Sequence, residues 1–313
     1  MINVPLMGDK YTIEDGSAPV LDGSTPNIEV SSRQYPLLFE ILRSFTTLAE
    51  TLNLSHAVRE LGSTRQTLRR HISQLEEIKG GALFNVADRQ YELTDLGRKV
   101  LPEAEDLLTQ ADAWVNGNSQ MINGMQHLKI VGDDGWCYYQ QQHPIGGVFR
   151  SSNDMLGTCL QAWADAGGEI EHDAMQAVRP KCMTFRRSDG NWVFTEVGEE
   201  SSFMSWFGWK IARSTIGRPL GQLPGGSRFD RLVNAAYLEV EQTQSLRLDH
   251  CFTVLQNTEI GGPVPICYER LLLGSRFADG SFAVVSALRR TYDVEIRGVT
   301  DDMLRQMPEK FLM

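Results

Sequence analysis

The sequence has no apolar run long enough to cross a bilayer, which takes about 20 consecutive residues in a helix. The opening residues, MINVPLMGDKYTIEDG, lack the basic region and apolar core that mark a secretory signal. Cysteine is scarce, and no two cysteines form a CxxC pair: they are Cys137, Cys159, Cys182, Cys251 and Cys267. An odd number of isolated cysteines is typical of reduced thiols. These absences predict a cytoplasmic protein with no membrane partner and no disulfide framework.

The motifs of common catalytic sites are also missing. There is no GxSxG, HExxH or Walker A motif, and no GxGxxG follows a predicted strand. The histidines show no spacing that suits metal ligands: they are His56, His71, His127, His143, His172 and His250. We therefore predict no enzyme activity, no catalytic residue, no metal site and no resident cofactor. An unknown small-molecule ligand, or a haem bound through one of the histidines, is left open.

The composition describes a globular chain with an excess of acidic residues. Of its 313 residues, 42% are hydrophobic and 22% are charged, and the formal net charge is -10. This balance argues against binding nucleic acid over the whole surface. It does not exclude a local basic patch, because salt screens charges beyond about 10 Å.

Periodicity and turn residues divide the chain into four parts, and the predicted fold class is α+β. Residues 1–32 are rich in Gly, Ser, Pro and Asp and are expected to form a flexible arm. Residues 33–97 form a first domain, and 98–117 a long linker helix. A polar, glycine-containing linker over 116–125 precedes the last domain, residues 126–313.

The pattern of the first domain predicts a winged helix-turn-helix. An amphipathic helix over 35–52 is followed by NLSHAVRELG, in which Asn53 is a plausible N-cap and Gly62 can end the helix. A third helix starts at Ser63 or Thr64, where the S-x-x-Q spacing indicates a capping box. The segment GGALFNVADRQYELT then predicts a two-stranded ribbon with a turn near residues 87–88.

The third helix carries a cluster of arginines on its polar side. Leu68, Ile72 and Leu75 line its apolar face, and residues 64–72 contain no acidic side chain. The outward residues are Arg65, Gln66, Arg69, Arg70 and Ser73. The planar guanidinium of arginine pairs with guanine O6 and N7 or with a phosphate, and such a helix fits the major groove. The alternative is that these residues form an ordinary solvated helix face. The surrounding turn and ribbon favour DNA binding over this alternative.

The segment LRSFTTLAETLNLSHAVRELGSTRQTLRRHISQLEEIKGGALFNVADRQYELTDLGRKVL resembles, without a gap, the DNA-binding domain of LysR-type transcriptional regulators. The resemblance implies a role in double-stranded DNA binding for Thr64, Arg65, Gln66, Thr67, Arg69, Arg70, Ser73 and, in the wing, Arg89. The chain departs from the family pattern at Thr64-Arg65-Gln66, where Ser-Gln-Pro is usual. Val86 displaces the usual arginine after Leu-Phe. These changes imply an unusual operator or a weaker dependence on the wing.

The linker helix has apolar residues spaced four, three, four and three: Val100, Ala104, Leu107, Ala111 and Trp114. This heptad seam predicts pairing with the same helix of a second copy, hence a homodimer. The alternative is that the helix packs only on its own domain.

The last domain has a mixed pattern of strands and helices rather than regular alternation. The segments STIGRPLGQLPGGSRFDRL and PVPICYERLLLGSRFADGSFAVVSALR resemble a PAS-type sensor domain. We expect one curled antiparallel sheet with helices on one face and an apolar pocket for a small-molecule effector. The candidate ligand-binding residues are Trp206, Trp209, Phe252, Tyr268 and Leu272, unless they simply fill the core. Docking of a regulatory protein is a further alternative for this domain.

These features together predict a sequence-specific, DNA-binding transcriptional regulator. The rival hypothesis is an interaction adaptor whose helix-turn-helix no longer binds DNA. The arginines of the third helix argue against this rival hypothesis, because a helix-turn-helix that no longer binds DNA would not need them.

Overall fold

The computed structural model describes residues 38–87, 90–132, 134–150, 154–188, 190–222, 226–257 and 259–313. By its contacts the chain divides into Met1–Pro36 and Leu37–Met313. The predicted arm, residues 1–32, and Arg89 of the predicted wing lie outside the described residues.

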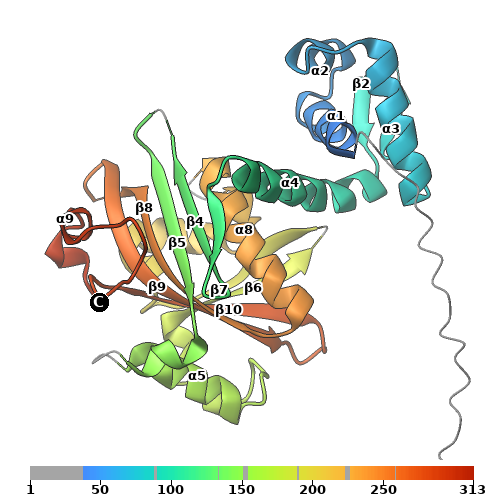
Figure 1. Cartoon of the computed structure of the whole chain (residues 1–313). Helices are drawn as coiled ribbons and strands as arrows, with labels where there is room; N and C mark the ends of the chain where they lie inside the picture. The colour runs from blue at the N-terminus through green and yellow to red at the C-terminus, as the bar shows by residue number, and fades with distance from the viewer. Residues whose placement is uncertain are drawn as a thin grey trace, which may run out of the picture. The chain divides into compact units, whose positions relative to one another are not determined.

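Three helices and a small hairpin open the second unit, in agreement with the predicted winged helix-turn-helix (Figure 1). Their bounds are Leu38–Thr51 for α1, Leu54–Glu60 for α2, Arg65–Lys79 for α3, Phe84–Ala87 for β1 and Gln90–Leu93 for β2. β1 and β2 pair antiparallel. Phe45 of α1, Leu68 of α3 and Leu83, just before the hairpin, are fully buried in one hydrophobic core. The three-to-four-residue spacing of apolar side chains thus places one face of each longer helix inside.

The helix ends lie where the sequence predicts them, with one correction. Asn53 caps α2 as predicted, since its side chain accepts hydrogen bonds from the backbone N–H groups of Ser55 and His56. Gly62 adopts the expected left-handed conformation, with φ 59°. The N-cap of α3 is Thr64, whose side chain accepts from Thr67 N–H, rather than Ser63 in a capping box with Gln66.

The base of the hairpin is fixed to the helices on both sides. The side chain of Glu76 on α3 accepts a hydrogen bond of 2.8 Å from Leu83 N–H, and Thr94 Oγ1 donates to the Ala82 carbonyl at 2.7 Å. A Cβ atom at Gly97 would lie 2.2 Å from the Leu83 carbonyl oxygen, so this close approach requires glycine.

The long helix α4 spans Asp95–Val115, close to the predicted 98–117, and contains Pro102. Val100 and Ala104, in its first half, belong to the core of the helix-turn-helix. Ala113, near its end, belongs to a separate cluster with Leu128 and Leu232.

An eight-stranded antiparallel sheet forms the centre of the C-terminal domain, in the order β3-β4-β5-β8-β9-β10-β6-β7. The strands are β3 Ser119–Ile122, β4 Met125–Val131, β5 Cys137–His143, β6 Cys182–Ser188, β7 Asn191–Val197, β8 Leu246–Asn257, β9 Gly262–Arg276 and β10 Phe282–Arg290. The prediction of a polar linker over 116–125 was wrong, because its middle is the edge strand β3. That strand is only half-buried or exposed.

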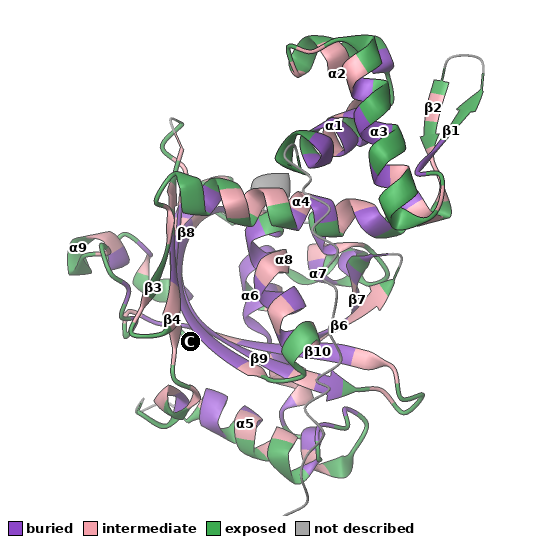
Figure 2. Ribbon diagram, turned by 45° about the vertical axis from the view of Figure 1, so that its right-hand side comes forward, coloured by how far each residue is buried: buried purple, intermediate pink, exposed green. Residues whose placement is uncertain are grey.

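The sheet curls, and helices cover both of its faces (Figure 2). The remaining helices are α5 Met155–Asp165, α6 Ser202–Phe207, α7 Trp209–Thr215, α8 Gly226–Thr243, α9 Asp301–Leu304 and short 3-10 turns at Ile145–Phe149, Asp173–Met175, Arg179–Lys181, Leu220–Gln222 and Glu309–Phe311. Side chains of α6 and α8 share one core with the sheet, and those of α5 share another with Leu271 and Leu273 of β9. The expectation of helices on one face is corrected, because β9 is buried on both faces. No helix within the described ranges combines the length and the apolar character that a membrane span needs.

Candidate nucleic-acid interface

The exposed face of α3 gathers most of the predicted DNA-binding residues. Leu68, Ile72 and Leu75 are buried in the domain core, which fixes the rotation of the helix. The side chains on its other face are exposed, namely Arg65, Gln66, Arg69, Arg70 and Ser73. Thr64 is exposed at the N-cap and Thr67 is half-buried beside it. Arg89, the residue expected in the wing, lies outside the described residues.

The first arginine is held in position by the preceding helix. Arg65 is the first residue of α3, and its Nη2 donates a 2.8 Å hydrogen bond to Ser55 Oγ on α2. A cation at a helix N-terminus opposes the helix dipole, so this arginine does not stabilise its own helix. The same end offers unpaired backbone N–H groups, and the combination favours an anion such as phosphate.

Arg69 and Arg70 extend this positive surface along the helix. Across the part of the chain that the structure describes, neither side chain forms a salt bridge. The first turn of α3 also contains no acidic residue. The local charge of α3 therefore differs in sign from that of the whole chain, and it faces outward.

His71 is a residue of this domain that the sequence did not single out. It lies on the buried face of α3, and its Nδ1 is 2.7 Å from Ser44 Oγ of α1. Burial, and then the charge of Arg70, lower the pKa of His71 below its ordinary value. Its place three residues after Leu68, in the apolar stripe of the helix, was a signal of burial.

The predicted seam of α4 separates into two parts. Val100 and Ala104 are buried in the core of their own domain, as the alternative interpretation requires. Leu107 and Trp114 are 56% and 74% exposed, with half-buried Ala111 between them. These two large side chains, one heptad apart, form an apolar stripe on the outside of α4.

The candidate ligand-binding residues also occupy different places. Trp206 and Tyr268 line a cavity in the core of the C-terminal domain. Phe252 and Leu272 are buried in the same core but are not among the described residues that line the cavity. Trp209 is 61% exposed.

Comparison with known proteins is in agreement with the N-terminal geometry. Residues 39–98 match the family model described as "Bacterial regulatory helix-turn-helix protein, lysR family". Over 82 residues, 26% of the chain, the sequence is 41% identical to the HTH-type transcriptional regulator IlvR of Caulobacter vibrioides, of which 28% is covered. Over 76 residues, 24% of the chain, it is 36% identical to the regulator DgdR of Burkholderia cepacia, of which 26% is covered. The chain thus spans little more than a quarter of the length of these curated relatives.

Solved structures match about a quarter of the chain. The CbnR DNA-binding domain in complex with DNA is 28% identical, with 25% of this chain and 91% of that chain covered and a TM-score of 0.25. Oxidised OxyR of Corynebacterium glutamicum is 27% identical, with 27% of this chain and 28% of that chain covered and a TM-score of 0.26.

Proposed function

We propose that this chain, whose residues 39–98 form a LysR-family helix-turn-helix domain, is a sequence-specific transcriptional regulator that binds duplex DNA as a homodimer. The observation that carries the proposal is the face of α3. Its apolar side is locked into the core by Leu68 and Leu75, so that Arg69 and Arg70 point outward without ion-pair partners in the described chain. A helix of this kind reads base edges in the major groove.

The proposed dimer rests on the outer stripe of α4. Leu107 and Trp114 are apolar, exposed and one heptad apart, which is the spacing of residues that pair helices. A twofold protein dimer favours an inverted-repeat operator with half-sites about 34–36 Å apart or a multiple of that distance.

For the C-terminal domain we propose a sensor role of the PAS type. The support is a curled antiparallel sheet that encloses a cavity against α6 and α8. The function proposed for the whole chain is regulation by binding, rather than catalysis.

A genome-wide map of bound sites tests the DNA-binding proposal directly. We expect discrete sites that share an inverted repeat, and their loss when Arg69 and Arg70 are both replaced by alanine. A map without enriched sites, together with stable capture of a protein partner by the helix-turn-helix, would support the adaptor hypothesis instead.

A further inference from the structure

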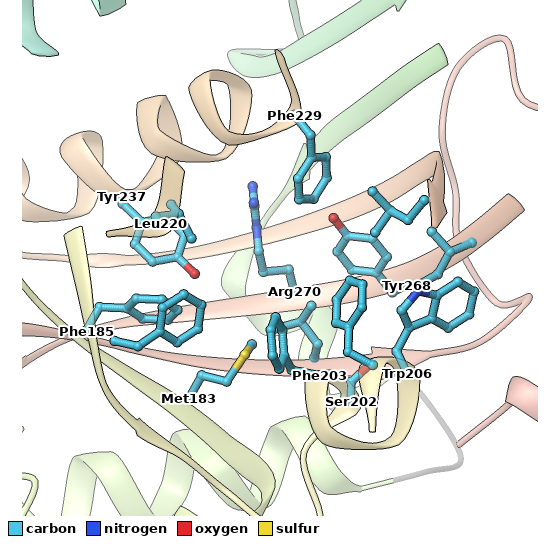
Figure 3. A pocket seen from close by; sticks show the side chains of 15 residues that line it. Met183, Phe185, Ser202, Phe203, Trp206, Leu220, Phe229, Tyr237, Tyr268 and Arg270 are labelled. Atoms are coloured by element: carbon cyan, nitrogen blue, oxygen red, sulfur yellow. The ribbon is translucent and has the colours of Figure 1, made fainter. Parts of the chain in front are cut away.

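The cavity in the C-terminal core has apolar walls and one charged side chain. Its volume is about 70 Å³, and its walls are built largely from aromatic and aliphatic side chains of β6, β9, α6 and α8. Among the described residues that line it, Arg270 is the only one that carries a charge. Figure 3 shows Arg270 rising from β9 between Tyr237 and Tyr268, with Phe203 and Trp206 on the α6 side.

The guanidinium of Arg270 is buried but only partly paired. The residue is 2% exposed. Its Nη2 donates to Asp249 Oδ2 at 2.8 Å and to Gln140 Oε1 at 2.9 Å. Its Nε and Nη1 have no hydrogen-bond partner within the described residues. Buried donors on a charged group are costly to leave unpaired, so these two nitrogens favour an added acceptor.

Arg270 shares its carboxylate partner, Asp249, with a second arginine. Asp249 is fully buried, and it accepts from Arg247 Nε at 2.9 Å as well as from Arg270. Burial alone would raise the pKa of Asp249, but the two guanidinium groups outweigh it and hold that pKa below its ordinary value. Arg247 also donates to Glu239 of α8, so the two guanidinium and two carboxylate groups of this cluster balance in charge. What Arg270 offers to the cavity is therefore its two unpaired N–H donors on a charged group.

We infer that this cavity binds a small monocarboxylic acid, with its carboxylate on Arg270 and its apolar body against the aromatic walls. Guanidinium and carboxylate match in charge and in hydrogen-bond geometry. A single cation among apolar walls suits one negative charge rather than a phosphate, and the small volume favours a body of few carbons. The inference deepens the proposed sensor role. The regulatory effect of binding rests on that proposed role, whereas the existence of the binding site does not.

The walls of the cavity connect it to the linker helix. Phe229 and Tyr237 of α8 line the cavity. On another side of α8, Asn234 Nδ2 donates a 2.7 Å hydrogen bond to Asp106 Oδ2 of α4. Binding of an acid in the cavity is expected to order α8. It should therefore change the contact of α8 with α4, the helix that carries the proposed dimer stripe.

The site is tested by titrating the full-length chain with sodium butyrate and with butyramide, an uncharged isostere, at ionic strength fixed with sodium chloride. Calorimetry and thermal unfolding are the readouts, because a ligand of the folded state raises the melting temperature. We expect butyrate to bind and butyramide to bind roughly tenfold to a hundredfold more weakly, since a hydrogen bond to a charged group is lost. Acetate through hexanoate are titrated in the same way to find the best length.

Three variants locate the site. Arg270→Gln is expected to remove the preference for butyrate over butyramide. The matched control is Arg247→Lys, which perturbs the same Asp249 cluster at a residue outside the cavity lining and should keep that preference. Leu288→Phe adds bulk to the cavity wall at the position paired with Arg270 across β9 and β10, and should abolish binding. If circular dichroism shows that Arg270→Gln is unfolded, the Leu288→Phe variant tests whether the acid binds in the cavity.

Equal binding of butyrate and butyramide, or no binding of any acid in the series, overturns the inference. So does undiminished binding to Leu288→Phe. None of these measurements uses DNA, so a failure of the DNA-binding proposal leaves them unaffected. If an acid binds but leaves operator affinity unchanged, the site stands and the proposed sensor role is overturned.

Discussion

Ser44 Oγ lies 2.7 Å from His71 Nδ1, and this buried pair joins α1 to the helix that carries the arginines. Burial lowers the pKa of His71 below its ordinary value of 6.5, with a further contribution from Arg70. At His71 the unfolded state therefore binds more protons than the folded state below about pH 6.5, and this residue lowers the free energy of unfolding as the pH falls.

Between about pH 7.5 and about pH 5.5 we expect the wild type to lose more resistance to urea than His71→Gln does. Glutamine keeps a polar contact for Ser44 but does not titrate. The measurement is helical circular dichroism against urea at both pH values. His56→Gln, an exposed position on α2, is the control, and an equal reduction in that variant would contradict the role of His71.

Replacing arginines of α3 should weaken specific DNA binding. Arg69→Ala or Arg70→Ala is expected to cost roughly 1–3 kcal/mol for a side chain that reads a base. Arg43→Ala is the control, because Arg43 is exposed on α1 and paired with Glu40. Fluorescence anisotropy with an operator from the binding map measures the change. Unchanged affinity in the Arg69→Ala, Arg70→Ala double variant would rule out α3 as the recognition helix.

Leu107→Asp should split the proposed dimer while leaving the monomer folded. Leu107 is 56% exposed within one chain, so the new charge is buried only where two copies pair. Light scattering then reports the mass of a monomer. Asp112→Lys is the control, since it is exposed and lies about 140° around the helix from Leu107. A Leu107→Asp protein that remains dimeric would place the interface elsewhere.

Asp230→Asn should stabilise the protein above neutral pH. Both carboxylate oxygens of Asp230 are buried without a hydrogen-bond partner among the described residues, and burial raises its pKa from 3.8 to about 7. The folded state therefore binds more protons than the unfolded state between these values, and stability is lost as the pH rises through about 7.

Melting temperatures of the wild type and of Asp230→Asn across this pH range check the expectation. The variant should gain most at about pH 8, where the wild type buries a charge, and little at about pH 5. Asp112→Asn, at an exposed site on α4, serves as the control and should show no such trend. An Asp230→Asn protein that is less stable at alkaline pH would show that the carboxylate has a favourable partner.

The helix-turn-helix was predictable because its signals are local. The spacing of Leu68, Ile72 and Leu75 fixes which side of α3 is buried, and Asn53 and Gly62 mark the ends of α2. The resemblance to a family pattern without gaps added the expected roles of the outward residues. The cap of α3 was misplaced by one residue because Ser63 and Thr64 are both good caps.

The C-terminal domain was less predictable because its structure depends on pairing between distant strands. β3 lies within the polar, glycine-containing segment 116–125, whose composition predicts a linker, although the strand pairs with β4 at the edge of the sheet. The buried cluster of Arg247, Asp249 and Arg270 was missed, since the strand partner Asp249↔Arg270 is set by register and not by neighbouring residues. The two-residue spacing of Arg247 and Asp249, which places both on one face of β8, was the available signal.

The helix α4 has a consequence for how the protein unfolds. It supplies Val100 and Ala104 to one hydrophobic core and Ala113 to another. The helix continues from Asp95 to Val115, with one backbone hydrogen bond missing at Pro102, so loss of structure at either end removes support from the other. Heat is therefore expected to melt both cores in one cooperative transition rather than in two successive ones.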